Sequence, residues 1–200
     1  MPDLEIPLLI SVMNKGTLNV EEKKEIVKML IDHHADVTKI DNNGNTLLHV
    51  ATSSGNLELV TLFAQKCDIH ARNDHGHTAL SYAFLNPDQN IASFLMRHGA
   101  KIDVKDKEEN TILAQSVLFK GDLAVERILK LGSININEKN KHHQTALDMA
   151  KTLEPLSELK KYMDPKTLPN YQELYDAEEK KIKRIIDLLE AEVHREKHKN

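Results

Sequence analysis

A segment of about 33 residues recurs along the chain, and this repetition limits the folds that the sequence can adopt. Four copies open on a threonine, and the threonines stand 32, 33 and 34 residues apart. The copies read Thr46-Leu-Leu-His-Val-Ala51, Thr78-Ala-Leu-Ser-Tyr-Ala83, Thr111-Ile-Leu-Ala-Gln-Ser116 and Thr145-Ala-Leu-Asp-Met-Ala150. We expect the small residue that ends each segment to let neighbouring helices approach closely, so that stacked units share one core.

A turn precedes every copy. The first two turns read Asp41-x-x-Gly44 and Asn73-x-x-Gly76, in which glycine supplies the positive φ of a tight turn. The third and fourth turns carry Glu109 and His143 in place of that glycine. We therefore expect these two turns to be looser or differently twisted.

A second apolar helix follows each of the first three threonine segments and ends in a tail such as Lys66-Cys-Asp-Ile69 or Gly99-Ala-Lys-Ile102, and the outer helix of the first repeat ends in a similar tail, His34-Ala-Asp-Val37. Turn, threonine segment and tail together resemble the ankyrin repeat, whose pattern runs from Asp-x-x-Gly through Thr-Pro-Leu-His to Gly-Ala-Asp-Val-Asn. The resemblance covers roughly residues 24–163, although no copy keeps the proline after threonine. It implies an all-α fold, an ankyrin-repeat solenoid of stacked helix-turn-helix repeats with short turn fingers.

The resemblance divides the chain into an array at 1–163 and a linker with a C-terminal amphipathic helix at 164–200. The array holds about five repeats, at 4–37 (an N-terminal cap), 38–71, 72–104, 105–137 and 138–163. In the cap we expect an inner helix at 4–13 and an outer helix at 21–33. Terminal repeats are usually atypical because one of their sides faces water.

One long helix is predicted at 171–197, outside the repeat pattern. Its apolar residues fall on one stripe at helical spacing, namely Tyr171, Leu174, Tyr175, Ile182, Ile185, Ile186, Leu189 and Val193. We expect this stripe to fold back on the last repeat as a cap. The alternative is self-association as a coiled coil, because residues 175, 182 and 189 stand seven apart.

Composition argues against several classes of protein. Acidic and basic residues are mixed throughout at a net charge of −4, so no basic stripe indicates nucleic-acid binding. The single cysteine, Cys67, leaves no internal disulfide and fits a reducing compartment. No apolar run reaches the roughly 18–20 residues of a membrane helix, and the N-terminus does not read as a secretory signal. We expect a cytoplasmic protein without a membrane or nucleic-acid partner.

Chemistry-bearing motifs are missing from the sequence. It contains no glycine-rich phosphate loop and no hydrolase or kinase signature. His75 with His77, and His142 with His143, form two pairs that cannot share one ion, whereas a zinc site needs three or four converging ligands. Cys67 is expected to be a buried structural thiol. We expect no enzyme activity, no metal and no cofactor.

Partner binding is what the resemblance implies, through the turn tips and the concave face of the inner helices. It also gives His49 a structural role, in which hydrogen bonds tie one turn to the next. The positions that align with the family's usual contacts are Asn42, Asn43, Asn45, Asp74, His75, His77, Leu85, Lys107, Glu108, Asn110, Leu118, Phe119, Lys141, His142, Gln144 and Leu153.

The later copies are the favoured part of this surface, because Leu85, Leu118, Phe119 and Leu153 combine apolar groups with a polar rim. The alternative is that Phe119 turns into the core and that Leu153 packs under the last helix.

A non-catalytic protein–protein interaction module is therefore the predicted function. One specific form is a bacterial ankyrin-repeat effector secreted into the cytoplasm of a host cell. The Lys, Asn and Ile usage and the charged C-terminus favour this form. Two alternatives stay open, a targeting domain of a larger enzyme whose catalytic part lies outside this chain, and a homo-oligomer formed through the C-terminal helix.

Overall fold

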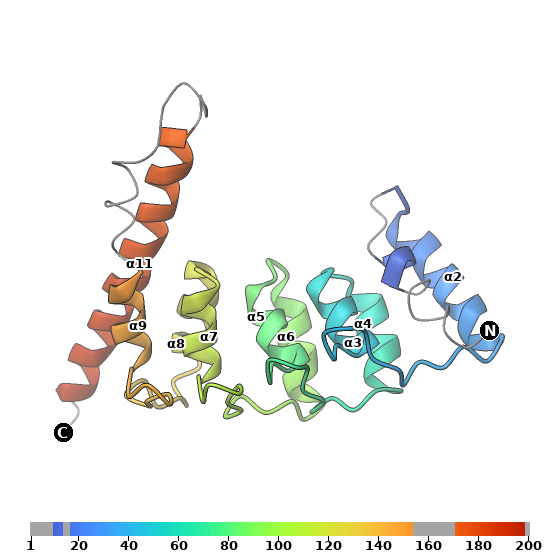
Figure 1. Cartoon of the computed structure of the whole chain (residues 1–200), viewed down its shortest axis with the longest axis horizontal. Coiled ribbons are helices and arrows are strands. Elements are labelled where there is room, and N and C mark those ends of the chain that lie inside the picture. The colour runs from blue at the N-terminus through green and yellow to red at the C-terminus, as the bar shows by residue number, and fades with distance from the viewer. Residues whose placement is uncertain (1–9, 14–16, 154–170, 199–200) are drawn as a thin grey trace. The chain divides into compact units, whose positions relative to one another are not determined.

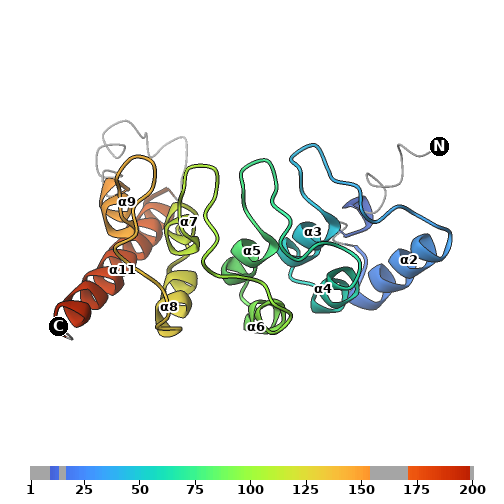
Figure 2. The same ribbon diagram turned by 90° about the horizontal axis from the view of Figure 1, so that it is seen from below.

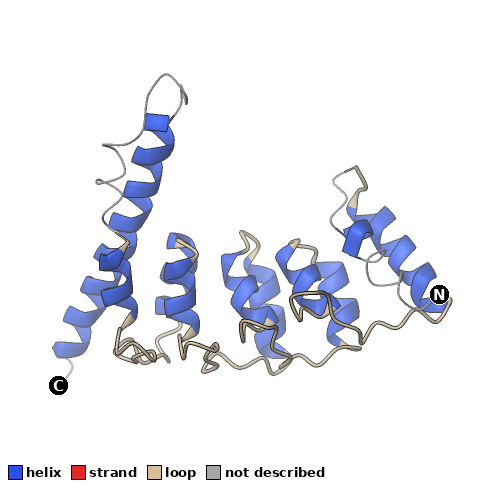
Figure 3. Cartoon of the chain, viewed as in Figure 1, coloured by secondary structure: helices blue, strands red, loops and turns tan. Residues whose placement is uncertain are grey.

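Helices joined by loops make up the described part of the chain, as the computed structural model shows (Figure 1, Figure 3). The structure describes residues 10–13, 17–153 and 171–198, with the backbone alone for 171–175. Tertiary contacts divide the chain into two compact units, Met1–Val104 and Lys105–Asn200. The predicted all-α fold is confirmed.

Unit 1 pairs short helices in two layers. Its helices are α2 (Val20–Asp32), α3 (Leu47–Ser53), α4 (Leu57–Ala64), α5 (Ala79–Leu85) and α6 (Gln89–Arg97), after a helical turn at 10–13. The inner helices α3 and α5 pack against each other, and each packs against the outer helix that follows it, α4 or α6 (Figure 2). The outer helices pack in the order α2, α4, α6.

The repeated threonines start the inner helices, as the spacing predicted. Thr46 and Thr78 adopt extended backbone before α3 and α5, and both take part in a capping box, which pairs backbone N–H groups that a helix start leaves unbonded. The small residues five positions on, Ala51 and Ala83, are fully buried between the packed helices. Because neither carries more than one methyl group, the helices can approach closely.

The N-terminal cap is described in part. Its predicted outer helix matches α2, which begins after Asn19. The Asn19 side chain accepts from the N–H of Glu22 at 2.9 Å, and the Glu22 carboxylate accepts from the N–H of Asn19 at 2.8 Å. Residues 4–9 of the predicted inner helix lie outside the described residues, and its residues 10–13 are helical.

Unit 2 contains α7 (Ile112–Leu118), α8 (Asp122–Lys130), α9 (Ala146–Thr152) and α11 (Tyr171–Lys197). The bounds of α11 are those predicted from the sequence. This helix packs against α9, the inner helix before it, and against α8, the outer helix of the preceding repeat. In unit 1, α6 has the same two relations, with α5 and α4. Thus α11 takes the place of an outer helix for the last repeat.

The apolar stripe of α11 is buried by this packing. Ile182, Ile185, Ile186 and Leu189 are between 0 and 7% exposed. Ion pairs surround the stripe, because Arg184 contacts Asp122 and Glu126 of α8, Lys120 contacts Glu178 at 3.3 Å, and Lys151 contacts Glu190 at 2.7 Å. This is the cap arrangement.

A coiled-coil seam through the same stripe would need Ile182 and Leu189, which already face α8 and α9. The side chain of Tyr175, the third seam residue, lies outside the described part.

The third and fourth turns keep the geometry of the first two, so the expectation of looser turns was wrong. Glu109 and His143 adopt φ of 61° and 59°, close to the 73° of Gly44. The N–H of each donates to the residue three positions before it at 3.0 Å, as Gly44 does to Asp41. The rest of the turn holds this backbone strongly enough to keep a non-glycine residue in the left-handed region.

Candidate protein-binding surface

One side-chain oxygen organises each turn. Asp41 Oδ1 accepts from the backbone N–H groups of Asn43 and Asn45, both at 2.8 Å. The same pair of bonds, with lengths of 2.8 to 3.0 Å, recurs at Asn73, Asp106 and Asn140. Aspartate and asparagine are interchangeable here because the turn needs only an oxygen acceptor. These Oδ1 atoms are engaged by the turn itself, and the residues at the turn tips face solvent.

Consecutive turns are joined by hydrogen bonds within unit 1. The backbone N–H of Asp74 donates to the carbonyl of Asn43 at 2.9 Å. The Asn73 amide donates to Asn45 Oδ1 at 2.8 Å and to Tyr82 Oη at 3.0 Å. The turn tips are thereby presented on a fixed backbone.

His49 holds the same two turns together, as the resemblance implied. Its Nδ1 accepts from the Thr46 N–H at 3.2 Å, so its Nε2 carries the proton and donates to the carbonyl of His77 at 3.1 Å. The ring is 1% exposed, and this burial lowers the pKa of His49 below its ordinary 6.5. The role of His49 is structural.

Unit 2 repeats these links. The N–H of Lys141 donates to the carbonyl of Glu108 at 3.1 Å, and the Asn140 amide donates to Asn110 Oδ1 at 2.9 Å. Asn110 is 4% exposed and also donates to Asp106 Oδ2 at 2.9 Å. We leave Asn110 out of the proposed surface, because its side chain is buried and is bonded to Asp106 and Asn140.

The other predicted contact residues differ in their exposure. In unit 1 the exposed ones are Asn42, Asn43, Asp74 and His75, and the half-buried ones are Asn45, His77 and Leu85. In unit 2 the exposed ones are Lys107, Glu108, Leu118, Phe119, Lys141 and His142, and the half-buried ones are Gln144 and Leu153. His142 lies 3.5 Å from Glu108 on the neighbouring turn.

Two adjacent apolar side chains are exposed at the end of α7. Leu118 is 46% and Phe119 is 47% exposed, so Phe119 does not turn into the core. Phe119 ends the helix, and Lys120 follows in the left-handed region at φ 53°. An exposed leucine and phenylalanine side by side suit a protein contact more than free solvent.

Cys67 is half-buried. Its Sγ lies 3.5 Å from the carbonyl of Val37, and burial raises the pKa of the thiol above its ordinary 9.0. A thiol held protonated is a poor nucleophile. Across the described residues, no group of three or more His, Cys, Asp or Glu side chains is placed to hold a metal ion.

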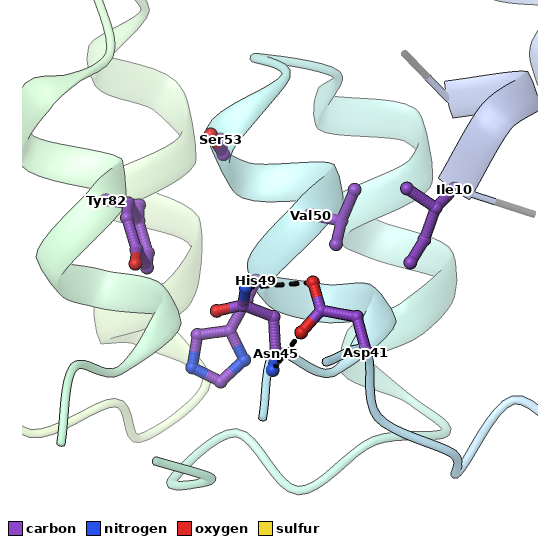
Figure 4. Close-up of a pocket in the computed structure, with 7 residues that line it drawn as sticks. All are labelled: Ile10, Asp41, Asn45, His49, Val50, Ser53 and Tyr82. Atoms are coloured by element: carbon purple, nitrogen blue, oxygen red, sulfur yellow. Dashed lines mark hydrogen bonds between the residues drawn. The ribbon is translucent and has the colours of Figure 1, made fainter. Parts of the chain in front are cut away.

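An open pocket of about 200 Å³ lies beside α3 in unit 1 (Figure 4). Its lining residues are Ile10, Asp41, Asn45, His49, Val50, Ser53 and Tyr82. The sequence analysis missed this pocket, although one signal was available. Tyr82 is aromatic where the other three copies carry Val50, Gln115 and Met149.

Comparison with known proteins agrees with the turn and helix geometry. A family model of ankyrin repeats, in three copies, matches residues 18–106. Residues 18–106 of this chain are ankyrin repeats. Ankyrin repeats generally mediate protein–protein interaction, and the family is typically non-enzymatic.

Several known proteins share this similarity. Alpha-latrotoxin-Lg1a of Latrodectus geometricus is 28% identical over 127 residues, which cover 62% of this chain and 9% of the toxin. Rabankyrin-5 of Mus musculus is 25% identical over 140 residues, covering 64% of this chain and 12% of that protein. The probable 26S proteasome regulatory subunit p28 of Saccharomyces cerevisiae is 30% identical over 110 residues, covering 54% of this chain and 48% of the subunit.

The ankyrin-repeat chain thus spans about a tenth of the length of the first two relatives and about half of the third. Within its described residues, no helix has both the length and the apolar character needed to cross a membrane.

Proposed function

We propose that this ankyrin-repeat chain is a non-catalytic binding module that holds another protein with its turn tips and inner-helix surface. The observation that carries the proposal is that, in each turn, the residue that forms the turn differs from the residues whose side chains face solvent. The side chains of Asp41, Asn73, Asp106 and Asn140 form the turns, whereas the exposed residues next to them join the turns through backbone groups and turn their side chains to solvent. Side chains free of a structural task can serve recognition.

In unit 2 the proposed surface combines Leu118 and Phe119 with the charged tips Lys107, Glu108 and Lys141. Protein interfaces usually combine apolar anchors with polar groups. Aromatic residues are enriched among the side chains that contribute most to binding. Phe119 is therefore the residue whose loss should weaken partner binding most.

The test is affinity purification with the full chain as bait, followed by calorimetry with the purified partner. We expect Phe119→Ser to weaken binding at least tenfold, since an aromatic anchor of an interface contributes more than about 1.4 kcal/mol. Leu131→Ser is the matched control, because Leu131 is 41% exposed at the end of α8 and outside the proposed surface. Circular dichroism verifies that both variants are folded. Unchanged affinity of folded Phe119→Ser would overturn the role of this surface.

A second candidate function is that of a targeting array within a larger protein. The relatives favour it, because Alpha-latrotoxin-Lg1a and Rabankyrin-5 extend far beyond the matched region. An L-asparaginase of Dirofilaria immitis is 26% identical over 127 residues, which make up 21% of that enzyme. The open reading frame around the coding sequence decides this question.

Two finer hypotheses accompany the proposal. Secretion as an effector into host cytoplasm is tested with a translocation reporter fused to the chain. Self-association through α11 is tested by the molar mass of the chain in solution. We propose a monomer, because a seam would have to pull Ile182 and Leu189 away from α8 and α9.

A further inference from the structure

We propose that the pocket beside α3 takes a cationic side chain, arginine or lysine, from the partner protein. The inference rests on the proposed binding function and names the chemistry of one contact. It concerns unit 1 alone, since the lining residues belong to the helical turn at 10–13, the first turn, α3 and α5.

The charge of the pocket comes from Asp41. Asp41 carries the one formal charge among the lining residues when His49 is neutral. Partial burial raises the pKa of Asp41, but the hydrogen bonds from Asn45 and Asn43 together lower it by more. The net effect is a pKa below the ordinary 3.8. The carboxylate is ionised at neutral pH, and burial keeps His49 uncharged.

The pocket offers free hydrogen-bond acceptors, one of them on a carboxylate and two on hydroxyl groups, which can also donate. Oδ1 of Asp41 already accepts two N–H groups, whereas Oδ2 accepts only from the Asn45 amide, at 3.0 Å, and can take another donor. Tyr82 Oη accepts from Asn73 at 3.0 Å and has capacity for a second donor, and the Ser53 hydroxyl lines the exposed rim. Both ring nitrogens of His49 are engaged by Thr46 and His77.

The pocket walls suit the stem of a long basic side chain. Figure 4 places Ile10 and Val50 on one side, Tyr82 on the other, and the Asp41 carboxylate, bonded by Asn45, below Val50. Aliphatic side chains can pack along a methylene stem, while the Tyr82 ring can attract a cation to its face. A carboxylic acid would be repelled by Asp41, and a purely apolar group would leave Oδ2 without a new donor.

The chain itself supplies variants that should preserve the fold. Asp41→Asn keeps the turn acceptor, because Asn73 and Asn140 hold their turns through the same two N–H bonds, and it gives up the single bond from the Asn45 amide to Oδ2. Tyr82→Met introduces the residue that stands at the equivalent position of the fourth copy, Met149. The first variant removes the charge and the second removes the aromatic ring.

The experiment is a titration of the isotope-labelled full chain, followed by NMR, with blocked amino acids as probes. N-acetyl-arginine methylamide and the lysine analogue are compared with the citrulline analogue, which has almost the shape of arginine without its charge, and with the leucine analogue. We expect the cationic probes to bind in about the millimolar range and at least about fivefold more tightly than citrulline. The shifted amides should be those of Asn45, Val50, Ser53 and Tyr82.

Asp41→Asn and Tyr82→Met should each weaken arginine binding by about fivefold while the rest of the spectrum keeps its dispersion. Equal binding of citrulline or leucine, or full binding to Asp41→Asn, would overturn the inference, as would the absence of binding by every probe. None of these results touches the proposed function, which fails separately if the Phe119→Ser variant keeps its partner.

Discussion

At the scale of single residues, the turns are built from the same bonds with different side chains. Asp41 and Asn73 hold their turns identically because each supplies one oxygen to two N–H groups. Glu109 and His143 adopt the glycine conformation for the same reason, since the surrounding bonds outweigh the cost of roughly 1–2 kcal/mol for a left-handed residue. Residue identity is therefore least informative where the backbone network is strongest.

Gly44→Ala should destabilise the chain more than Gly99→Ala. Both glycines have positive φ, 73° and 94°, so alanine is strained at either position. A Cβ at Gly44 would also lie 2.8 Å from the backbone nitrogen of Asp74, whereas at Gly99 nothing lies within 4 Å. We expect Gly99→Ala to cost about 1 kcal/mol and Gly44→Ala about 1–2 kcal/mol more, measured by urea unfolding with circular dichroism. Equal losses would contradict the close approach of the two turns.

The burial of His49 should make the free energy of unfolding depend on pH. Burial lowers the pKa of His49 in the folded chain. When the pH falls below the ordinary pKa of 6.5, the unfolded state therefore binds a proton at His49 that the folded state does not bind. Stability present above that pH is then lost as pH falls toward the lower pKa of the folded state. We expect His49→Ala, with the residue found at the equivalent Ala114, to flatten the decline as the pH falls below 6.5. Identical slopes for wild type and variant would exclude His49 as the cause.

At the scale of elements, α11 completes the last repeat although it lies outside the repeat pattern. Ile185 and Leu189 are at most 1% exposed, and Arg184 pairs with Asp122 and Glu126 of α8. Exposed ion pairs contribute little, so the apolar stripe provides most of the stabilisation. The helix serves as the outer layer that the last repeat needs.

Ile185→Ala should therefore cost about 2–4 kcal/mol, because it removes a fully buried side chain and leaves a cavity against α8 and α9. Lys183→Ala, an exposed position on the same helix, should change stability by less than about 0.5 kcal/mol. Urea unfolding measures both. If the free energy of unfolding of Ile185→Ala equalled that of the wild type, the apolar stripe of α11 would not be part of the core.

At the scale of the whole molecule, repeats pack on their neighbours within each of the two units. The helices α2, α3, α4, α5 and α6 form one set of contacts and α7, α8, α9 and α11 another, and the division falls between Val104 and Lys105. This border lies where we place the join of the repeats at 72–104 and 105–137. In such arrays, stability is approximately a sum of repeat terms and nearest-neighbour terms.

The double variant Gly44→Ala with Ile185→Ala should accordingly lose the sum of the two single losses. The two residues belong to different units and share no packing partner among the described elements. We expect additivity within about 0.5 kcal/mol in the urea measurement. A coupling larger than about 1 kcal/mol would show that the repeats do not act as a nearest-neighbour array.

The repeat period by itself determined most of the architecture. The positions of Thr46, Thr78, Thr111 and Thr145 gave the starts of α3, α5, α7 and α9, because a threonine before an apolar run caps a helix. Apolar spacing also gave α2 and α11, since a single stripe at helical period requires a helix. These inferences succeed because they rest on local bonding and periodicity.

Only the tertiary structure decided which of the residues predicted to be exposed are buried or bonded within the fold. The sequence predicts Asn110 to be a contact residue, yet its side chain is buried against the next turn. The sequence leaves Phe119 either in the core or on the surface, and the structure shows it half exposed. Likewise the pocket at Asp41 and Tyr82 exists because one turn and two inner helices meet there. The physical reason is that burial depends on what a neighbouring repeat places against a residue, and a periodic sequence gives the neighbours without giving their side-chain contacts.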